Sequence, residues 1–192
     1  MNTKPQLNRL GRETQDMEIF FINRNNMSIL LNSKGMEKQE IFNLSQDDIH
    51  SLFPDDPNVG DLCIITTDFQ SSKKWFLGKN VWQDFDYNKI NKAQYSHLSE
   101  YKLTNSHYLF TYNNTKYEKL SETYEYLFDF CNQHNLQINA ILEIFPTETP
   151  RSNDAEIVVD IYFAIQNEIP KQLLEQYLPF KIHRRKYNFF TY

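Results

Sequence analysis

The chain has 192 residues, 40% of them hydrophobic, which is enough to bury a core in one domain or in one domain built from two similar halves. Its net charge of −5 argues against nucleic acid as the main partner, and its two cysteines make neither a disulfide framework nor, by themselves, a metal site. No apolar run approaches the roughly 18 residues of a membrane span, so we expect a protein of the reducing cytoplasm with no membrane partner.

The first half of the chain predicts strands around one short helix. Residues 1–16 are polar and lack an apolar signal core, so we expect a short tail. Glu18–Leu31 is interpreted as strand, turn, strand or as one bent strand. Ser45, followed by acids, is typical of a helix N-terminus, and this helix must end before Pro54. A β-branched strand, a second strand and a polar linker with room for a helical turn follow in order: Asp61–Phe69, Lys73–Trp82 and Asp84–Glu100.

The second half repeats this order, offset by roughly ninety residues. Ser106–Tyr112 is predicted to be a strand. Thr115 to Glu118 fits a capping box, and the helix that follows is expected to run to about Asn132. Its apolar stripe has helical spacing: Leu120, Tyr124, Leu127, Phe128 and Cys131.

A hairpin is the part around which we expect the chain to be organised: Ile138–Phe145, the polar loop Pro146–Ala155, and Glu156–Ile165. Each strand has one wholly apolar face suited to packing against a helix, because strand side chains alternate: Ile138, Ala140, Leu142 and Ile144 in the first strand, and Ile157, Val159, Ile161, Phe163 and Ile165 in the second. The other face mixes aromatic rings with carboxylates.

Glu143 is the odd residue of that mixed face, because it lies between Ile141 and Phe145 in the strand. A lone acid there is costly unless something offsets its charge. We interpret the offsetting group as a ligand. The alternatives are a local hydroxyl or lysine, or a position at a wet edge of the sheet.

The high aromatic content, 15% of the chain, suggests which ligand this would be. Rings around one carboxylate suit a bulky delocalised cation, and each ring face can add about 0.5–2 kcal/mol. Trp82 is preferred to Trp75, since Trp75 shares a face with Leu77 and Val81. The expected ligand-binding residues are Glu143, Tyr108, Phe110, Tyr112, Ile141, Phe145, Tyr162 and Trp82. The three rings of the strand at 106–112 could instead pack under the helix as core.

The C-terminal segment differs in charge from the rest of the chain. Pro170 and Pro179 frame a predicted helix, Lys171–Leu178. Residues 171–192 hold five Lys or Arg and one acid, so this segment carries +4 and leaves −9 for the rest. We expect an extra strand, an oligomer contact or a lid rather than a nucleic-acid arm. The five histidines lack metal-ligand spacing and no phosphate loop is present, so neither a metal nor a cofactor is expected.

The order of elements and several local patterns resemble the GyrI-like small-molecule-binding domain, which is also the effector domain of multidrug-sensing bacterial regulators. The likeness spans roughly residues 17–166 and is carried by four patterns: Tyr101–Phe110, Lys116–Asn132, Lys74–Val81, and Leu142-Glu-Ile-Phe145 with Val159-Asp-Ile-Tyr162. There are three departures. Residues 1–16 leave no room for a DNA-binding domain, Asn113-Asn114-Thr115 replaces the family's glycine before the second helix, and the basic aromatic tail is outside the pattern.

The resemblance implies an α+β fold, a pseudo-twofold repeat of two β-α-β-β (SH2-like) units framing a central groove that faces away from the two helices. Repeat one would cover about residues 17–83, a linker 84–100, repeat two about 101–166, and an extension 167–192. In such domains a buried glutamate on the second hairpin meets lipophilic cations, and Glu143 is the matching position.

The implied function is standalone binding of hydrophobic, cationic small molecules. One alternative is a hydrolase that detoxifies small electrophiles in the same groove, with Glu143 and Tyr112 or Tyr162 activating water. A second is a protein-interaction module that acts on a DNA-handling partner such as gyrase. A homodimer through the C-terminal extension is compatible with any of these.

Overall fold

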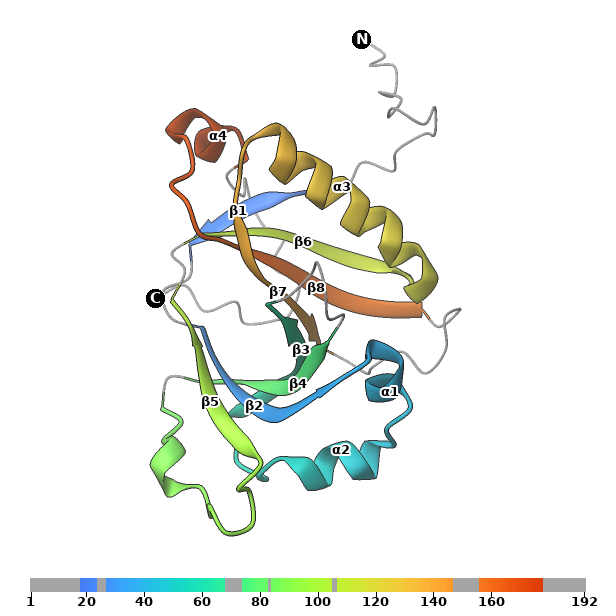
Figure 1. Ribbon diagram of the computed structural model, residues 1–192, viewed down its shortest axis with the longest axis vertical. Coiled ribbons are helices and arrows are strands. Elements are labelled where there is room, and N and C mark those ends of the chain that lie inside the picture. Colours follow the sequence, from blue (N-terminus) through green and yellow to red (C-terminus); the bar gives the residue numbers. More distant parts are fainter. Residues whose placement is uncertain are drawn as a thin grey trace.

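In the computed structural model one eight-stranded antiparallel sheet carries helices on one face, so the predicted α+β class is confirmed (Figure 1). The structure describes residues 18–23, 27–67, 74–82, 84–104, 107–146 and 156–177. The order across the sheet is β1-β6-β8-β7-β3-β4-β2-β5. The strands are β1 (Phe20–Asn23), β2 (Met27–Met36), β3 (Val59–Thr66), β4 (Trp75–Val81), β5 (Leu98–Leu103), β6 (His107–Lys116), β7 (Ile138–Phe145) and β8 (Glu156–Ile165). The helices are α1 (Lys38–Phe42), α2 (Gln46–Leu52), α3 (Leu120–Gln133) and α4 (Lys171–Gln176), with 3-10 turns η1 (Tyr87–Lys89) and η2 (Tyr117–Lys119).

The strand order has a regularity that links the two halves of the chain. If β1 to β4 are exchanged with β5 to β8, each strand for the one whose number differs by four, the same order is obtained when the sheet is followed from its opposite edge. β2 and β6 have ten residues each and begin 80 positions apart, at Met27 and His107. These two strands are therefore separated by fewer residues than the offset of roughly ninety that the sequence predicted between its two halves. The outermost strands cross over, since β1 pairs with β6 and β5 pairs with β2.

Several elements form where local sequence predicts them. β7 and β8 pair as the expected hairpin. The Ser45 side chain accepts a hydrogen bond from the backbone N–H of Asp48, which caps α2. Asn135 adopts a left-handed φ of 54° directly after α3, the backbone conformation that ends many helices. α4 begins at Lys171 as predicted and ends at Gln176. The expected N-terminal tail and the C-terminal extension after Tyr177 lie outside the described residues.

The structure differs from the local predictions at three places: one helix start is wrong, one helix was not predicted, and one predicted linker is shorter than expected. The helix expected to start at Thr115 begins later, because the backbone of β6 continues to Lys116 in register with β8 and α3 begins only at Leu120, without a side-chain cap. Helix α1 occupies a stretch for which the sequence predicted no element. The segment 84–100 contains the expected helical turn, η1, but its last three residues already belong to β5.

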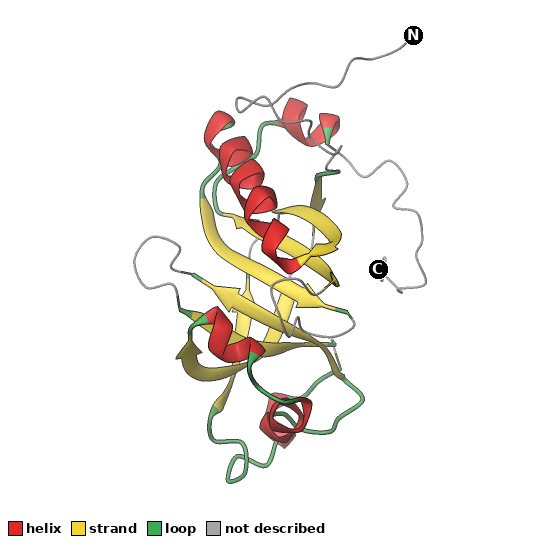
Figure 2. Cartoon of the chain, turned by 90° about the vertical axis from the view of Figure 1, so that its right-hand side faces the viewer, coloured by secondary structure: helices red, strands yellow, loops and turns green. Residues whose placement is uncertain are grey.

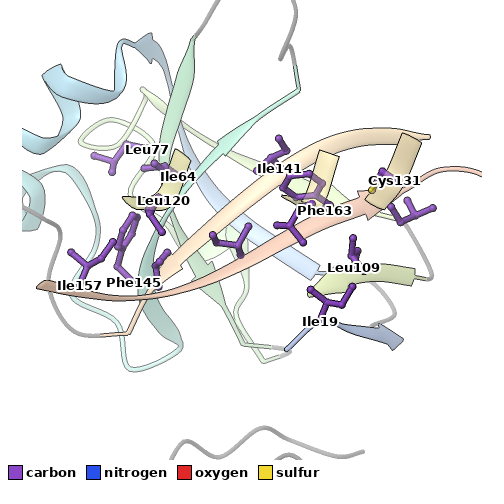
Figure 3. Close-up of a cluster of buried hydrophobic side chains, with 14 of the residues drawn as sticks. Ile19, Ile64, Leu77, Leu109, Leu120, Cys131, Ile141, Phe145, Ile157 and Phe163 are labelled. Carbon is purple, nitrogen blue, oxygen red and sulfur yellow. The ribbon is translucent and has the colours of Figure 1, made fainter. Parts of the chain in front are cut away.

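The sheet buries side chains on both faces. We call the face that carries the helices the helix face; Figure 3 shows part of its core, with Ile64, Ile141, Phe145 and Phe163 among the labelled side chains. The opposite face, the inner face, is enclosed because the sheet curves (Figure 2). The buried core of this face contains residues of β2 and β5 together with residues of β6 and β8. One hydrogen bond also links the two sets, since the Tyr108 hydroxyl of β6 donates to the carbonyl oxygen of Leu103 of β5 at 3.5 Å. No helix in the described part of the chain is long and apolar enough to cross a membrane.

Candidate functional site

Glu143 lies at the centre of the sheet, on the helix face. β7 and β3 are the two middle strands, and the direct cross-strand neighbours of Glu143 are Ile64 and Ile161. The prediction that helices cover Ile157 to Ile165 of β8 is confirmed. For β7 it is wrong, because Ala140, Leu142 and Ile144 pack on the inner face. The physical reason is the register: Glu143 pairs with Ile161 and therefore shares its face. The expected groove facing away from the helices consequently does not contain this carboxylate.

Two groups from different helices meet one oxygen of Glu143. The Tyr124 hydroxyl of α3 donates a hydrogen bond to Oε1, and the Lys38 ammonium of α1 forms an ion pair with the same atom. The glutamate side chain is 0% exposed and that of Lys38 is 21% exposed. The other oxygen, Oε2, is buried and has no hydrogen-bond partner within the described structure. The hydroxyl and the lysine that we considered as alternatives to a ligand are therefore both present, as Tyr124 and Lys38. The carboxylate oxygen Oε2 is left without a donor among the described residues.

Three aromatic rings surround the Lys38 ammonium; we call Trp75, Tyr117 and Tyr124 the aromatic box. Their ring centroids lie 4.2, 5.3 and 5.2 Å from Nζ of Lys38, within the distance of about 6 Å at which a cation is attracted to a ring face. Each of the three residues is partly exposed, so the box lies near the molecular surface above the fully buried carboxylate.

The aromatic box is held by a second layer of rings. Phe42 of α1 contacts Tyr117 edge-on, with centroids 4.7 Å apart, and also contacts Phe145 beside Glu143. Phe163 of β8 stacks on Tyr124 at 5.9 Å. Residues from both halves of the chain therefore build one site: Lys38 and Trp75 from the first half, and the two tyrosines and Glu143 from the second.

The two tyrosines of the box are neutral phenols, and Tyr124 donates the hydrogen bond to Glu143. Burial raises the pKa of Tyr124 well above its ordinary value, and the nearby charge of Glu143 raises it further. The same two causes raise the pKa of Tyr117. Both phenols keep their protons at neutral pH and can donate to the carboxylate or turn ring faces to a cation.

Lys38 reaches the site through a short helix that no local pattern predicted. α1 has five residues, and Glu37 caps it through a capping box with Glu40, in which Glu replaces the usual Ser or Thr. The buried side chains of Ile41 and Phe42 anchor the helix on the sheet. Lys38 is its first residue and lies 105 positions before Glu143 in the sequence, so no local pattern connects the two.

The structure separates the predicted site residues into three groups. Ile141 and Phe145 share the helix face with Glu143. Trp82 and Tyr112 are each 42% exposed, and Trp75, the tryptophan that we did not prefer, is the one that contacts Lys38. The remaining three predicted residues lie in the inner-face core: Tyr108, Phe110 and Tyr162. The ring centroids of Phe110 and Tyr162 are 4.9 Å apart. These residues therefore lie on the face of the sheet opposite to Glu143 and do not share a site with it.

Sequence reasoning missed Lys38, Tyr117 and Tyr124 as site residues. Tyr124 was recognised in the apolar stripe of its helix, and a tyrosine in such a stripe needs a partner for its hydroxyl; that was the available signal. Within the described residues no group of three or more His, Cys, Asp or Glu could hold a metal ion. Both cysteines are buried, and burial raises the pKa of the Cys131 thiol to about 12.

Comparison with known proteins gives structural relatives only. No family model matches the chain, and the search of curated proteins finds no significant match. Among solved structures, the EcmrR C-terminal domain aligns with a TM-score of 0.57 at 10% identity, over 80% of this chain and 100% of that one. A hydrolase encoded by lin2189 of Listeria innocua aligns with a TM-score of 0.54 at 10% identity, over 78% and 92% of the two chains.

A third solved structure is that of SAV2435 bound to tetraphenylphosphonium. It aligns with a TM-score of 0.51 at 13% identity, over 78% of this chain and 94% of that one. Likenesses at such identities describe the fold, and they agree with the resemblance drawn from the sequence. The chain therefore has the GyrI-like fold.

Proposed function

We propose that this protein binds hydrophobic, cationic small molecules in the aromatic box above Glu143. The observation that carries the proposal is the position of the Lys38 ammonium, which lies among three aromatic rings and is paired with a fully buried carboxylate. A site that holds a primary ammonium in this way has the charge and the ring faces that a ligand cation needs.

The chemistry of the site favours a bulky, delocalised cation. Such an ion is weakly hydrated, so it loses little when it enters a partly buried box, and each ring can contribute about 0.5–2 kcal/mol. Oε2 of Glu143 shares the single negative charge of the carboxylate and has no hydrogen-bond partner among the described residues. If the site serves many ligands, affinity should be roughly micromolar, or about −8 kcal/mol. The solved structure with tetraphenylphosphonium supports the same class of ligand for this fold.

We also propose that the two halves are pseudo-twofold repeats, about residues 17–83 and 101–166, related by an axis between β3 and β7. The symmetric strand order and the 80-residue spacing of β2 and β6 support this. Ile64 lies directly opposite Glu143 across the two central strands. The site would then be asymmetric, because the residue opposite the glutamate carries no charge.

Calorimetric titration with tetraphenylphosphonium tests the proposed function. The wild type should bind saturably, and Glu143→Gln should weaken binding at least tenfold, or about 1.4 kcal/mol. Glu100→Gln is the matched control, because Glu100 is paired with Lys102 at 3.2 Å on the surface, far from β7 in the sheet order. Equal binding by the wild type and Glu143→Gln would remove Glu143 from the site, and absence of binding by the wild type would contradict the proposal.

A hydrolase is the second candidate, favoured by the hydrogen bond from Tyr124 to Glu143 and by the hydrolase among the solved structures of this fold. Tyr124 would take the role first considered for Tyr112 or Tyr162. Glu143 would have to activate water, whereas its side chain is fully buried and engaged by Lys38. Turnover of a panel of small esters and epoxides, lost in both Glu143→Gln and Tyr124→Phe, would favour this candidate over binding alone.

A further inference from the structure

We infer that Lys38 is an internal competitor for the site: its ammonium occupies the aromatic box until a ligand cation displaces it, and this competition selects which cations bind. The inference rests on the proposed function and adds to it the regulation and selectivity of the site. It starts from one juxtaposition, a lysine of α1 placed where the ligand cation is expected.

The contacts of Lys38 are the contacts that a ligand would need. Its Nζ lies over all three rings of the aromatic box and is ion-paired with Oε1 of Glu143. A second cation at the same distance from the rings would lie within a few ångströms of the first, and like charges at that separation repel each other. A ligand that uses the whole box must therefore move the lysine out.

The structure gives Lys38 a route out that the other members of the site lack. Its side chain is 21% exposed and begins at the first residue of α1, so rotation about its own bonds can bring the ammonium into water. The helix itself need not move, since Ile41 and Phe42 remain buried in the core. Glu143 has no such freedom, because its side chain is fully buried on a central strand.

Competition by a tethered ammonium predicts a definite selectivity. A free primary amine makes the same contacts as Lys38, but it must compete with a group held at an effective local concentration on the millimolar scale. A phosphonium, a quaternary ammonium or a rhodamine differs, because its charge is weakly hydrated while the displaced lysine regains strong hydration. The site should therefore reject primary amines and accept delocalised cations. If the lysine leaves the box in about one molecule in a hundred or fewer, ligand affinity is lowered by about that factor or more.

The test compares Lys38→Met with Lys92→Met in titrations with tetraphenylphosphonium and with n-butylammonium. Lys92 is the matched control, because it lies 5.2 Å from the ring of Tyr87 at an exposed position. Lys38→Met should bind the phosphonium at least tenfold more tightly, and it should bind n-butylammonium, which the wild type should not. Lys92→Met should behave as the wild type in both titrations.

The outcomes separate this inference from the proposed function. If the wild type binds the phosphonium and Lys38→Met binds it equally or more weakly, Lys38 is a structural residue and the inference is wrong. If neither protein binds it, the proposed function itself fails.

A second measurement uses the wild type alone, so it does not depend on the folding of a variant. An amine-acetylating reagent should modify Lys38 slowly in the free protein and at least severalfold faster at saturating phosphonium, with Lys92 unchanged, as read by peptide mass spectrometry. An unchanged or slower rate at Lys38 would overturn the displacement.

Discussion

Substitution of either member of the Lys38–Glu143 pair should destabilise the free protein, and the two costs should differ. Breaking a buried pair by removing one partner typically costs about 3–5 kcal/mol, because the other charge is left uncompensated. In Lys38→Met the stranded charge is that of Glu143, which is 0% exposed and sits on a central strand, so it cannot reach water. We therefore expect the full cost, at least about 3 kcal/mol.

The opposite substitution should cost less. In Glu143→Gln the stranded charge is that of Lys38, whose side chain is 21% exposed and can turn outward. The amide oxygen of Gln can still accept the hydrogen bond from Tyr124. The remaining loss is that of charge-assisted hydrogen bonds at a partly exposed pair, about 1–2 kcal/mol.

Urea unfolding, followed by the fluorescence of the two tryptophans, measures both costs by linear extrapolation. The double variant completes the cycle, and it should cost less than Lys38→Met alone, because no charge is then buried without a partner. A larger cost for Glu143→Gln than for Lys38→Met, or a double variant whose cost is the sum of the two, would refute the assignment of Glu143 as the trapped charge.

Three further predictions follow from the geometry. Because burial and Glu143 raise the pKa of Tyr124 above its ordinary value of 10.0, the folded protein keeps a proton that the unfolded chain loses above pH 10. The free energy of unfolding should therefore decline as the pH rises above 10. In urea titrations at several pH values, Tyr124→Phe should make this decline less steep by up to about 1.4 kcal/mol per pH unit. Equal slopes of the unfolding free energy against pH in the wild type and the variant would contradict the raised pKa. Trp75→Leu should weaken phosphonium binding severalfold in calorimetry and Trp82→Leu should not, since Trp75 is the ring nearest to Lys38; the reverse ranking would restore the sequence-based preference. Cys63 and Cys131 are 0% and 1% exposed, so a disulfide reagent should modify neither thiol in the native state and both in urea, and rapid native labelling would show that the core opens.

The sequence was sufficient for the parts of the fold that local alternation and caps determine. The β7–β8 hairpin follows from strict alternation of apolar residues, and α2 follows from Ser45 and its acids. The importance of Glu143 was also readable, because an acid between Ile141 and Phe145 conflicts with its surroundings unless it has a partner.

What the sequence could not predict depends on contacts between distant residues. The face of β7 was misassigned because apolar residues lie on both of its faces, so alternation alone does not show which face meets the helices; the pairing of Glu143 with Ile161 decides it. Tyr108, Phe110 and Tyr162 were expected near Glu143, but the curvature of the sheet encloses them on its other face. Lys38 belongs to a helix of five residues without a Ser or Thr cap, and its partner is 105 positions away.

The most direct test of the central claim is to titrate the wild-type protein with two ions of the same shape and opposite charge, tetraphenylphosphonium and tetraphenylborate. If the aromatic box and Glu143 recognise positive charge, the phosphonium should bind saturably with one site per chain, and the borate should bind at least a hundredfold more weakly, or about 2.8 kcal/mol. Equal binding of the two ions would show that the site recognises apolar bulk rather than charge, and preference for the borate would mean that Lys38, not Glu143, is the charge that ligands meet.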